Sequence, residues 1–308
     1  MSAPDRPAAR RVVGVVVTYN RLDLVRGLVA ALRGTEGLSG VYVVDNASTD
    51  GTGEWLLAQA DDFCRPVLLE SNTGGAGGFN AGLAAAVGTD ADLIWLMDDD
   101  GVPAPDCLDV LLRRDDLDFW GPAVVDRDDP ERLVFPIRLP GGTRVVHGMG
   151  EVRAAAVDGL IRDVVIPFNG VLVTRALVER IGLPREEFFI WGDDHEYRLR
   201  AMAAGARTAT VVDATFRHPS VGELGTPMAF GRTTYNHSPS DLKHYCMARN
   251  NLVNLRTYAG LPHALAFVAK TVWFYTFTRP NAARLRLSVR GFLAGVRGDF
   301  TGHRRFLS

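Results

Sequence analysis

Cysteine is scarce in this chain. Its 308 residues include only three cysteines, Cys64, Cys107 and Cys246, which stand far apart. An odd number at such wide spacing gives neither a disulfide framework nor a pair of the kind that binds zinc or forms a redox couple. We therefore expect the protein in a reducing compartment, the cytoplasm.

The chain also lacks a long hydrophobic run. Residues 1–11 are polar and rich in proline, alanine and arginine, and no apolar segment typical of a secretory signal follows them. The longest apolar stretch, Leu261–Thr278, contains His263 and Lys270 and is short for a bilayer span. We therefore expect a flexible N-terminus over residues 1–11 and no transmembrane helix.

Net charge is nearly absent as well. Lysine and arginine together number 34 against 36 acidic residues, a formal charge of -2, which gives no reason to expect a nucleic-acid partner. The bases are unevenly placed, because the chain from Arg279 onward carries seven arginines and a single acid, Asp299. The C-terminus is therefore a basic segment on a near-neutral protein.

Two familiar nucleotide-binding motifs are missing. No Gly-Lys-Ser/Thr phosphate loop is present, which excludes kinase or ATPase chemistry of that type. The glycine-rich loop Asn72-Thr73-Gly74-Gly75-Ala76-Gly77-Gly78-Phe79 lacks the dinucleotide spacing and follows the third expected strand instead of the first. This placement disfavours NAD binding.

What the sequence does contain is an alternation of apolar strands and helical repeats. Val12–Val17 is a continuous β-branched run typical of a strand buried on both faces, and further strands are expected at Val41–Val44, at Val67–Leu69 and before Asp98. Asn20 is the expected N-cap of the first helix. The pattern predicts an α/β fold with a mostly parallel, doubly wound sheet over residues 12–240, followed by a helical segment over residues 241–308.

In such a sheet, ligands bind beyond the carboxyl ends of the strands. Four polar features fall at this edge: Thr18-Tyr19-Asn20, Asp45, the glycine-rich loop and the aspartate triplet Asp98-Asp99-Asp100. Their convergence predicts a binding site there.

The aspartate triplet carries the strongest chemical signal. Adjacent carboxylates repel one another, and alternate side chains of an extended segment point to the same side, so we expect Asp98 and Asp100 to face a common point and Asp99 to face away. A hard divalent cation there, Mn²⁺ or Mg²⁺, would turn repulsion into coordination and leave positions for a diphosphate. The structural alternative is an acidic loop that ends the strand and starts a helix near Pro103.

Each other candidate also has a structural alternative. Asp45 either caps a turn or accepts hydrogen bonds from a base or ribose, and the glycines either serve packing or let the backbone approach a ligand. The acids of Trp191-Gly192-Asp193-Asp194-His195-Glu196 either interact with a helix dipole or supply a general base toward an acceptor hydroxyl. His218 is either a surface histidine or a third cation ligand that would favour manganese.

Together these motifs resemble a family 2 glycosyltransferase of the GT-A fold. The residues that carry the resemblance are the Thr18-Tyr19-Asn20 strand end, Val43-Val44-Asp45-Asn46, the glycine-rich loop, the aspartate triplet, the Asp193-Asp194 helix start and Tyr245-x-x-x-Arg249-Asn250. Within the family, the glycine-rich loop and Leu133-Val134-Phe135-Pro136 are similar to those of actinobacterial galactofuranosyltransferases, which start the cell-wall galactan on a polyprenyl-linked acceptor.

The resemblance implies roles for individual residues. Asp45 would hold uracil, and Asp98, Asp100 and His218 would bind the cation that bridges a UDP diphosphate. Asp194 matches the general base, although the more usual Glu-Asp pair is here Asp-Asp, which leaves Asp193 as the alternative. The remaining implied contacts are Thr18, Tyr19, Asn20, Asn72, Gly74, Gly75 and Asp98 with the donor nucleotide, and Trp191, Glu196 and Asn169 with sugar or acceptor.

The implied function is inverting, metal-dependent transfer of galactofuranose from UDP-galactofuranose to a hydroxyl of a polyprenyl-diphosphate-linked glycan. The alternatives are a rhamnosyltransferase using dTDP-rhamnose, a sugar nucleotidyltransferase and a non-catalytic sugar-nucleotide-binding protein. The C-terminal segment is compatible with peripheral contact at the inner face of the plasma membrane, because an apolar helix precedes its arginines, and equally with packing on another subunit.

Overall fold

The structure is a computed structural model that describes residues 10–222, 225–229 and 233–307. The flexible N-terminus expected over residues 1–11 thus lies, for residues 1–9, outside the described part. The chain divides into two compact units. The first unit comprises residues 1–72, 78–183 and 204–220, and the second comprises residues 73–77, 184–203 and 221–308.

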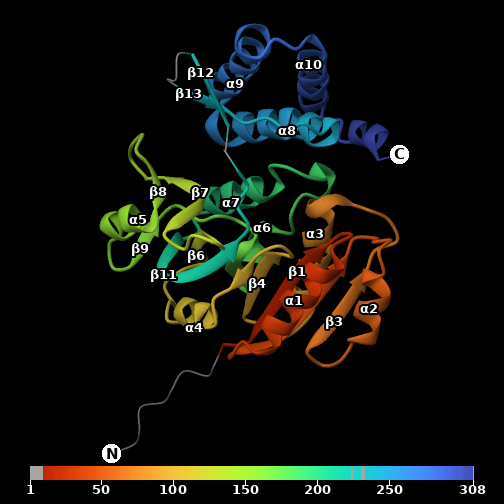
Figure 1. Cartoon of the computed structure of the whole chain (residues 1–308), viewed down its shortest axis with the longest axis vertical. Helices are drawn as coiled ribbons and strands as arrows, with labels where there is room; N and C mark the ends of the chain where they lie inside the picture. The colour runs from red at the N-terminus through yellow and green to blue at the C-terminus, as the bar shows by residue number, and fades with distance from the viewer. Residues whose placement is uncertain (1–9, 223–224, 230–232, 308) are drawn as a thin grey trace, which may run out of the picture. The chain divides into compact units, whose positions relative to one another are not determined.

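The first unit is built on a mixed, mostly parallel sheet (Figure 1). The strand β1, Val12–Thr18, is buried along its whole length and pairs in parallel with β2 on one side and β4 on the other. The strand order is β3-β2-β1-β4-β10-β6-β11-β5. The predicted α/β fold is therefore confirmed. The other strands are β2 (Leu38–Asp45), β3 (Cys64–Leu68), β4 (Leu93–Asp98), β5 (Val102–Pro103), β6 (Phe119–Asp126), β7 (Arg132–Arg138), β8 (Val145–Gly148), β9 (Leu160–Arg162), β10 (Asn169–Thr174) and β11 (Thr208–His218).

Helices cover both faces of β1, as its two-sided apolar pattern requires. Val12 and Val16 pack in one cluster with Val25 and Leu28 of α1. Val15 and Val17 instead approach glycines of α3. The helices that begin in this part of the chain are α1 (Leu22–Arg33), α2 (Thr52–Ala58), α3 (Gly74–Val87), α4 (Cys107–Leu112), α5 (Met149–Ala155) and α6 (Arg175–Ile181).

The glycine-rich segment differs from the loop that we expected. It is helical from Gly74, so α3 starts inside the glycine run. A β-carbon at Gly78 would lie 2.4 Å from Val17 Cγ1, and one at Gly82 would lie 2.4 Å from Val15 Cγ1. Real side chains do not approach so closely, so the glycines of α3 let the helix lie directly on β1.

Asn20 is not the N-cap that the sequence suggested. Helix α1 begins at Leu22, and the residue in the cap position, Arg21, makes no capping hydrogen bond with its side chain. Asn20 has a left-handed backbone, with φ 53°, and its side-chain oxygen accepts a hydrogen bond from the Thr49 N–H at 2.7 Å. The amide thus ties the end of β1 to the turn after β2.

The second unit is mainly helical, which confirms the expected C-terminal helices. Helices α8, α9 and α10 pack on one another, and a short hairpin of β12 and β13 accompanies them (Figure 1). Its elements are η1 (Glu186–Phe188), α7 (Asp193–Ala203), β12 (Thr226–Met228), β13 (Thr233–Tyr235), α8 (Asp241–Asn254), η2 (Leu255–Ala259), α9 (Leu261–Trp273), η3 (Phe274–Thr278), α10 (Ala282–Arg297) and η4 (Gly302–Phe306). Over the described residues, no helix has the length and apolar character needed to cross a membrane.

Candidate functional site

The carboxyl ends of β1, β2 and β4 place the predicted donor-side residues next to one another. Thr18 pairs in register with Asp45, and Val17 pairs with Asp98. Because the three strands are parallel, their polar ends lie at one edge of the sheet. The sequence prediction of a shared edge for these residues is therefore confirmed within the first unit.

Asp45 caps the turn that follows β2. Its Oδ1 accepts a hydrogen bond from the Ser48 N–H at 3.1 Å, and the Ser48 hydroxyl accepts one from the Asn20 N–H at 2.8 Å. A β-carbon at Gly53 would lie 2.9 Å from Asp45 Oδ2. The structural alternative for Asp45 is thus present in the molecule, and its role toward a base stays a prediction.

Asp99 does not face away from Asp100 as strand alternation suggested. Strand β4 ends at Asp98, and the next two aspartates lie in a turn. One atom, Arg21 Nη1, lies 2.8 Å from both Asp99 Oδ1 and Asp100 Oδ2. Asp99 Oδ2 also accepts a hydrogen bond from the Thr18 hydroxyl at 2.7 Å. The expected alternation is wrong because it holds only for an extended backbone.

Asp100 and His218 form an ion pair. Nε2 of His218 lies 3.1 Å from Asp100 Oδ1, while Nδ1 of the same ring lies 2.7 Å from the Pro219 carbonyl oxygen. Burial alone would raise the pKa of Asp100, but the contact with His218 and the charges of His218 and Arg21 lower it to about 2. The carboxylate is thus held ionised, the form that a cation requires.

The predicted cation ligands are only partly assembled. Asp100 and His218 are in contact, but no group of three or more histidine, cysteine or acidic side chains is arranged to hold a metal ion within the described ranges. Asn169 pairs with Met97, next to Asp98, and its buried Oδ1 lacks a hydrogen-bond donor in the described part of the chain. An oxygen acceptor at this strand end is the ligand type that a hard cation prefers, so the residues fit such an ion.

In the second unit, a strained loop leads into the Asp193-Asp194 helix start. Phe189 has φ 66° and ψ -65°, and the Ile190 N–H donates to the Phe188 carbonyl at 2.8 Å, which makes a γ-turn of the strained type. Trp191 and Gly192 follow with φ of 68° and 86°. Helix α7 starts at the next residue, so the strained backbone sets the direction in which its first carboxylates project.

Polar side chains of α8 hold this loop. The Asn250 amide donates to the carbonyl oxygens of Phe188, Ile190 and Trp191 at 3.0, 3.2 and 2.8 Å. The amide of Asn254 donates to the Gly192 carbonyl at 2.8 Å, and the fully buried Arg249 guanidinium donates to the Phe188 carbonyl at 2.9 Å. The carbonyl oxygens of this loop thus accept hydrogen bonds from side chains of one helix, in place of the backbone hydrogen bonds of regular structure.

The start of α3 meets the same loop. The Ala76 N–H donates to the Phe189 carbonyl oxygen at 3.1 Å, and a β-carbon at Gly74 would lie 2.0 Å from that oxygen. Gly74, which also has φ 73°, is therefore required for this contact. Beside Gly75 the space for a β-carbon is open. Nucleotide contact by these glycines stays a prediction, as it does for Tyr19, which is exposed, and for the half-buried Asn72.

The two candidate bases differ in accessibility. Asp193 is 6% exposed, whereas Asp194 is partly exposed and its Oδ1 accepts a hydrogen bond from the His195 N–H at 2.6 Å. Burial raises the pKa of Asp193, and the neighbouring charge of Asp194 raises it further. Burial also raises the pKa of Asp194. Carboxyls with raised pKa values suit proton transfer, and only Asp194 offers an exposed surface.

Glu196 and Trp191 have contacts inside the unit. The Glu196 carboxylate is buried, lies 2.8 Å from Arg200 Nη2, and accepts a hydrogen bond from the Tyr258 hydroxyl at 2.6 Å. Trp191 packs against an aromatic cluster that includes Tyr235. In this arrangement Glu196 fastens α7 to η2, and sugar or acceptor contact by either residue stays a prediction.

Sequence reasoning missed the roles of Arg21, Arg249 and Asn254. A signal existed for Arg249 and Asn250, because a charged and an amide residue beside Cys246, Met247 and Ala248 in one helix must find partners when buried. Arg21 is the only base of residues 18–24, which follow the first strand, and the acids are expected to converge at that strand end. Neither pattern predicts which residues these side chains bind, because that depends on tertiary contacts.

Comparison with known proteins now places the chain in a class. The family described as Glycosyl transferase family 2 matches residues 15–138. The galactofuranosyltransferase GlfT1 of Mycobacterium tuberculosis (strain ATCC 25618 / H37Rv) is 33% identical over 300 residues, covering 94% of this chain and 96% of the relative. An undecaprenyl-phosphate mannosyltransferase of Micrococcus luteus is 36% identical over 105 residues, which is 33% of this chain and 43% of that protein.

Solved structures confirm the fold. The mannosyltransferase PcManGT from Pyrobaculum calidifontis, in complex with GDP-Man and Mn²⁺, has a TM-score of 0.53 at 18% identity and covers 97% of this chain and 79% of its own. GalNAc-T7 with UDP, GalNAc and Mn²⁺ has a TM-score of 0.59 at 12% identity, over 95% and 58%. The chain belongs to glycosyltransferase family 2, has the GT-A fold and is a glycosyltransferase. It is similar to GlfT1 along nearly its whole length.

The α8 contacts yield a first prediction. Asn250→Asp places a carboxylate against three carbonyl oxygens, so the strained loop should relax and α7 should shift. We expect the rate of sugar transfer to fall on the order of 100-fold, because small misplacements of catalytic groups have effects of this size. The measurement is turnover, together with urea unfolding to obtain the change in stability.

Ser288→Ala is the matched control. It removes the buried hydroxyl of Ser288 on α10, which lies 2.8 Å from Nε2 of His244; His244 belongs to α8 but does not contact the loop. Both variants should lose about 1–3 kcal/mol of stability. Only Asn250→Asp should lose rate. Parallel loss of rate in the two variants would show that α8 acts through stability alone.

Proposed function

We propose that the enzyme transfers galactofuranose from UDP-galactofuranose, with inversion, to a hydroxyl of a polyprenyl-diphosphate-linked glycan in cell-wall synthesis. The observation that carries this proposal is the 33% identity to GlfT1 over 94% of the chain. A second, shorter similarity, to an undecaprenyl-phosphate mannosyltransferase, supports a lipid-linked substrate.

The donor side of the reaction falls to the first unit. Asp45, with Thr18, Tyr19, Asn20 and Asn72, would bind the uridine at the carboxyl edge of the sheet. A divalent cation held by Asp98, Asp100 and His218 would neutralise the diphosphate of the departing nucleotide, and the Mn²⁺ named with two similar structures supports this choice. Arg21 adds fixed positive charge beside Asp99 and Asp100.

The acceptor side falls to the second unit. Asp194 would remove the proton of the acceptor hydroxyl as that oxygen forms a bond to the anomeric carbon and the bond to UDP breaks. The transition state has oxocarbenium character, so a nearby carboxylate also stabilises it electrostatically. The partial exposure of Asp194 supports this choice over the buried Asp193.

A donor panel tests the proposed function. The enzyme is incubated with UDP-galactofuranose, other UDP-sugars and dTDP-rhamnose, in Mn²⁺, in Mg²⁺ and in EDTA, with a prenyl-diphosphate disaccharide as acceptor. We expect cation-dependent transfer from UDP-galactofuranose with release of UDP. Turnover with dTDP-rhamnose alone would instead establish the rhamnosyltransferase alternative.

The base assignment gives a separate prediction. Asp194→Asn should lower the transfer rate on the order of 100-fold or more, the usual contribution of a general base, while UDP binding stays unchanged. Asp193→Asn is the paired variant. If Asp193→Asn abolished transfer and Asp194→Asn did not, the base would be Asp193.

We further propose that α9 and η3 contact the membrane interface. Their exposed side chains are mostly apolar, with Trp273 45% and Phe277 67% exposed. The exposed face of α10 alternates apolar side chains with arginines, in the order Arg286, Val289, Arg290, Leu293, Val296 and Arg297. An apolar surface beside bases favours an anionic lipid leaflet over a neutral one.

Vesicle co-sedimentation tests the membrane proposal. Neutralising Arg286, Arg290 and Arg297 to Gln should weaken binding to anionic vesicles by about 1 kcal/mol per arginine, with little change for neutral vesicles. Leu57→Ser, at an exposed apolar residue of the first unit, is the control and should bind as the wild type does. Binding unaffected by the three neutralised arginines would favour packing on another subunit instead.

A further inference from the structure

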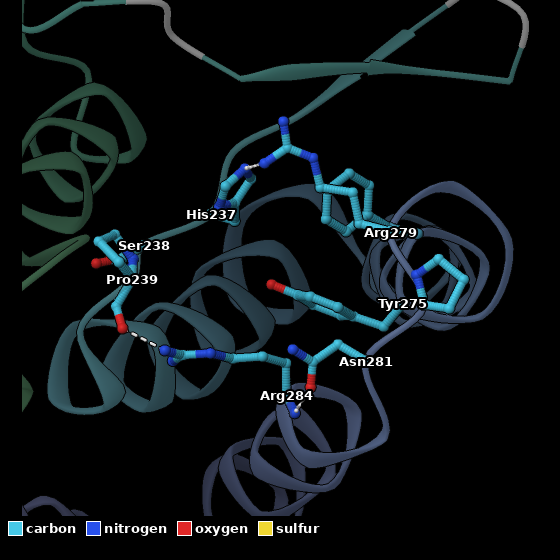
Figure 2. A pocket seen from close by; sticks show the side chains of 9 residues that line it. His237, Ser238, Pro239, Tyr275, Arg279, Asn281 and Arg284 are labelled. Carbon is cyan, nitrogen blue, oxygen red and sulfur yellow. Dashed lines mark hydrogen bonds between the residues drawn. The ribbon is translucent and has the colours of Figure 1, made fainter.

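A cavity of about 330 Å³ lies within the second unit, between the segment before α8 and the junction of η3 with α10. Its volume is at the lower end of the range for small-molecule sites. Figure 2 shows Arg279 beside His237 at one side of it and Arg284 at another, with the Tyr275 hydroxyl directed between them. None of the residues that line it is among those assigned above to donor, cation or base.

The charged groups of this cavity are cationic. No acidic side chain is among the residues that line it in the described part of the second unit. Arg284 Nη1 is paired with Asp241 Oδ1 at 2.8 Å, and its other nitrogen donates to the Pro239 carbonyl. Arg279 Nη1 lies 3.3 Å from His237 Nε2 and has no carboxylate partner among the described residues. Among the described residues, the Arg279 guanidinium is therefore left without a counter-ion.

The positive charges of the two arginines affect the protonation of His237. Burial lowers the pKa of its ring, and the charges of Arg279 and Arg284 lower it further. A histidine whose charged form is disfavoured by two arginines marks a region where an anion would be stabilised. His237 Nε2 also lies 3.0 Å from the Thr226 hydroxyl, which keeps the ring in place.

Part of the lining of the cavity is aromatic. Phe274 and Tyr275 of η3 line it, and Trp273 and Phe277, their neighbours in the chain, are exposed apolar side chains. A free inorganic anion would gain nothing from such a surface. A phosphate group attached to a hydrocarbon chain would use both, with its charge in the cavity and its chain on the exposed aromatic side chains.

We propose that the cavity bounded by Arg279, Arg284 and His237 binds the diphosphate of a prenyl-diphosphate lipid, held by the two guanidinium groups. This inference rests on the proposed lipid-linked acceptor and locates its charged group. The diphosphate supplies the counter-ion that Arg279 does not have among the described residues.

Direct binding, without turnover, tests the inference. Farnesyl diphosphate, inorganic pyrophosphate and farnesol are titrated calorimetrically into the full chain, with and without saturating UDP. We expect farnesyl diphosphate to bind more tightly than either fragment, and to bind equally well in the presence of UDP. Arg279→Gln should weaken its binding about tenfold, the loss of one charge-assisted contact. Arg256→Gln, at an exposed arginine of η2 outside the cavity, should leave it unchanged.

The outcomes separate this inference from the proposed function. Unchanged affinity in Arg279→Gln, or displacement of farnesyl diphosphate by UDP, would overturn the cavity as its site. Equal affinity for pyrophosphate and farnesyl diphosphate would overturn the lipid assignment. UDP binding that survives Arg279→Gln keeps the donor site of the proposed function intact whatever the lipid arm shows. Arg284→Gln provides a second variant, since loss of its contacts with Asp241 and Pro239 is detected separately by urea unfolding.

Discussion

The second unit depends on one set of hydrogen bonds, those from α8 to the backbone of residues 188–192. Three residues in this loop have positive φ, two of them with bulky side chains, and such a backbone persists only where its surroundings hold it. The Asn250 amide shares its two hydrogens among three of these carbonyl oxygens, Arg249 donates to one of the same three, that of Phe188, and Asn254 donates to that of Gly192. The direction of Asp193 and Asp194 is thereby set by a helix that begins 47 residues later in the chain than the end of this dipeptide.

In the first unit, several acidic side chains lie together at one edge of the sheet, and basic and hydroxyl side chains contact them. Arg21 bridges Asp99 and Asp100, Thr18 donates to Asp99, and His218 pairs with Asp100. These contacts do not treat the two acids alike. Burial raises the pKa of Asp99, whereas that of Asp100 is held near 2 despite burial. The two carboxyls are adjacent in sequence, but their pKa values are shifted in opposite directions.

The sequence was sufficient for features that depend on local pattern. The β-branched run of β1, the acids at strand ends and the helical C-terminal segment follow from periodicity and from the rule for parallel sheets. The sequence was insufficient for features that depend on contacts between residues far apart in the chain. The glycine-rich segment is part of α3, whose glycines are required because Val15 and Val17 leave no room there for side chains. Asn20 binds Thr49 instead of capping α1. Asp99 escaped strand alternation because β4 ends one residue earlier.

Arg21 clarifies what the aspartate triplet can do. Its guanidinium already neutralises Asp99, which is buried and bonded to Thr18 through its second oxygen, so both oxygens of Asp99 are engaged. Asp99 is thus the fixed counter-ion of Arg21 and is poorly suited to bind a cation. Both oxygens of Asp100 are engaged as well, by Arg21 and His218, but its side chain is 24% exposed, whereas that of Asp99 is 4% exposed. A divalent cation at this edge would therefore compete with Arg21 for Asp100 alone, while Asp99 keeps the guanidinium close enough to meet a diphosphate.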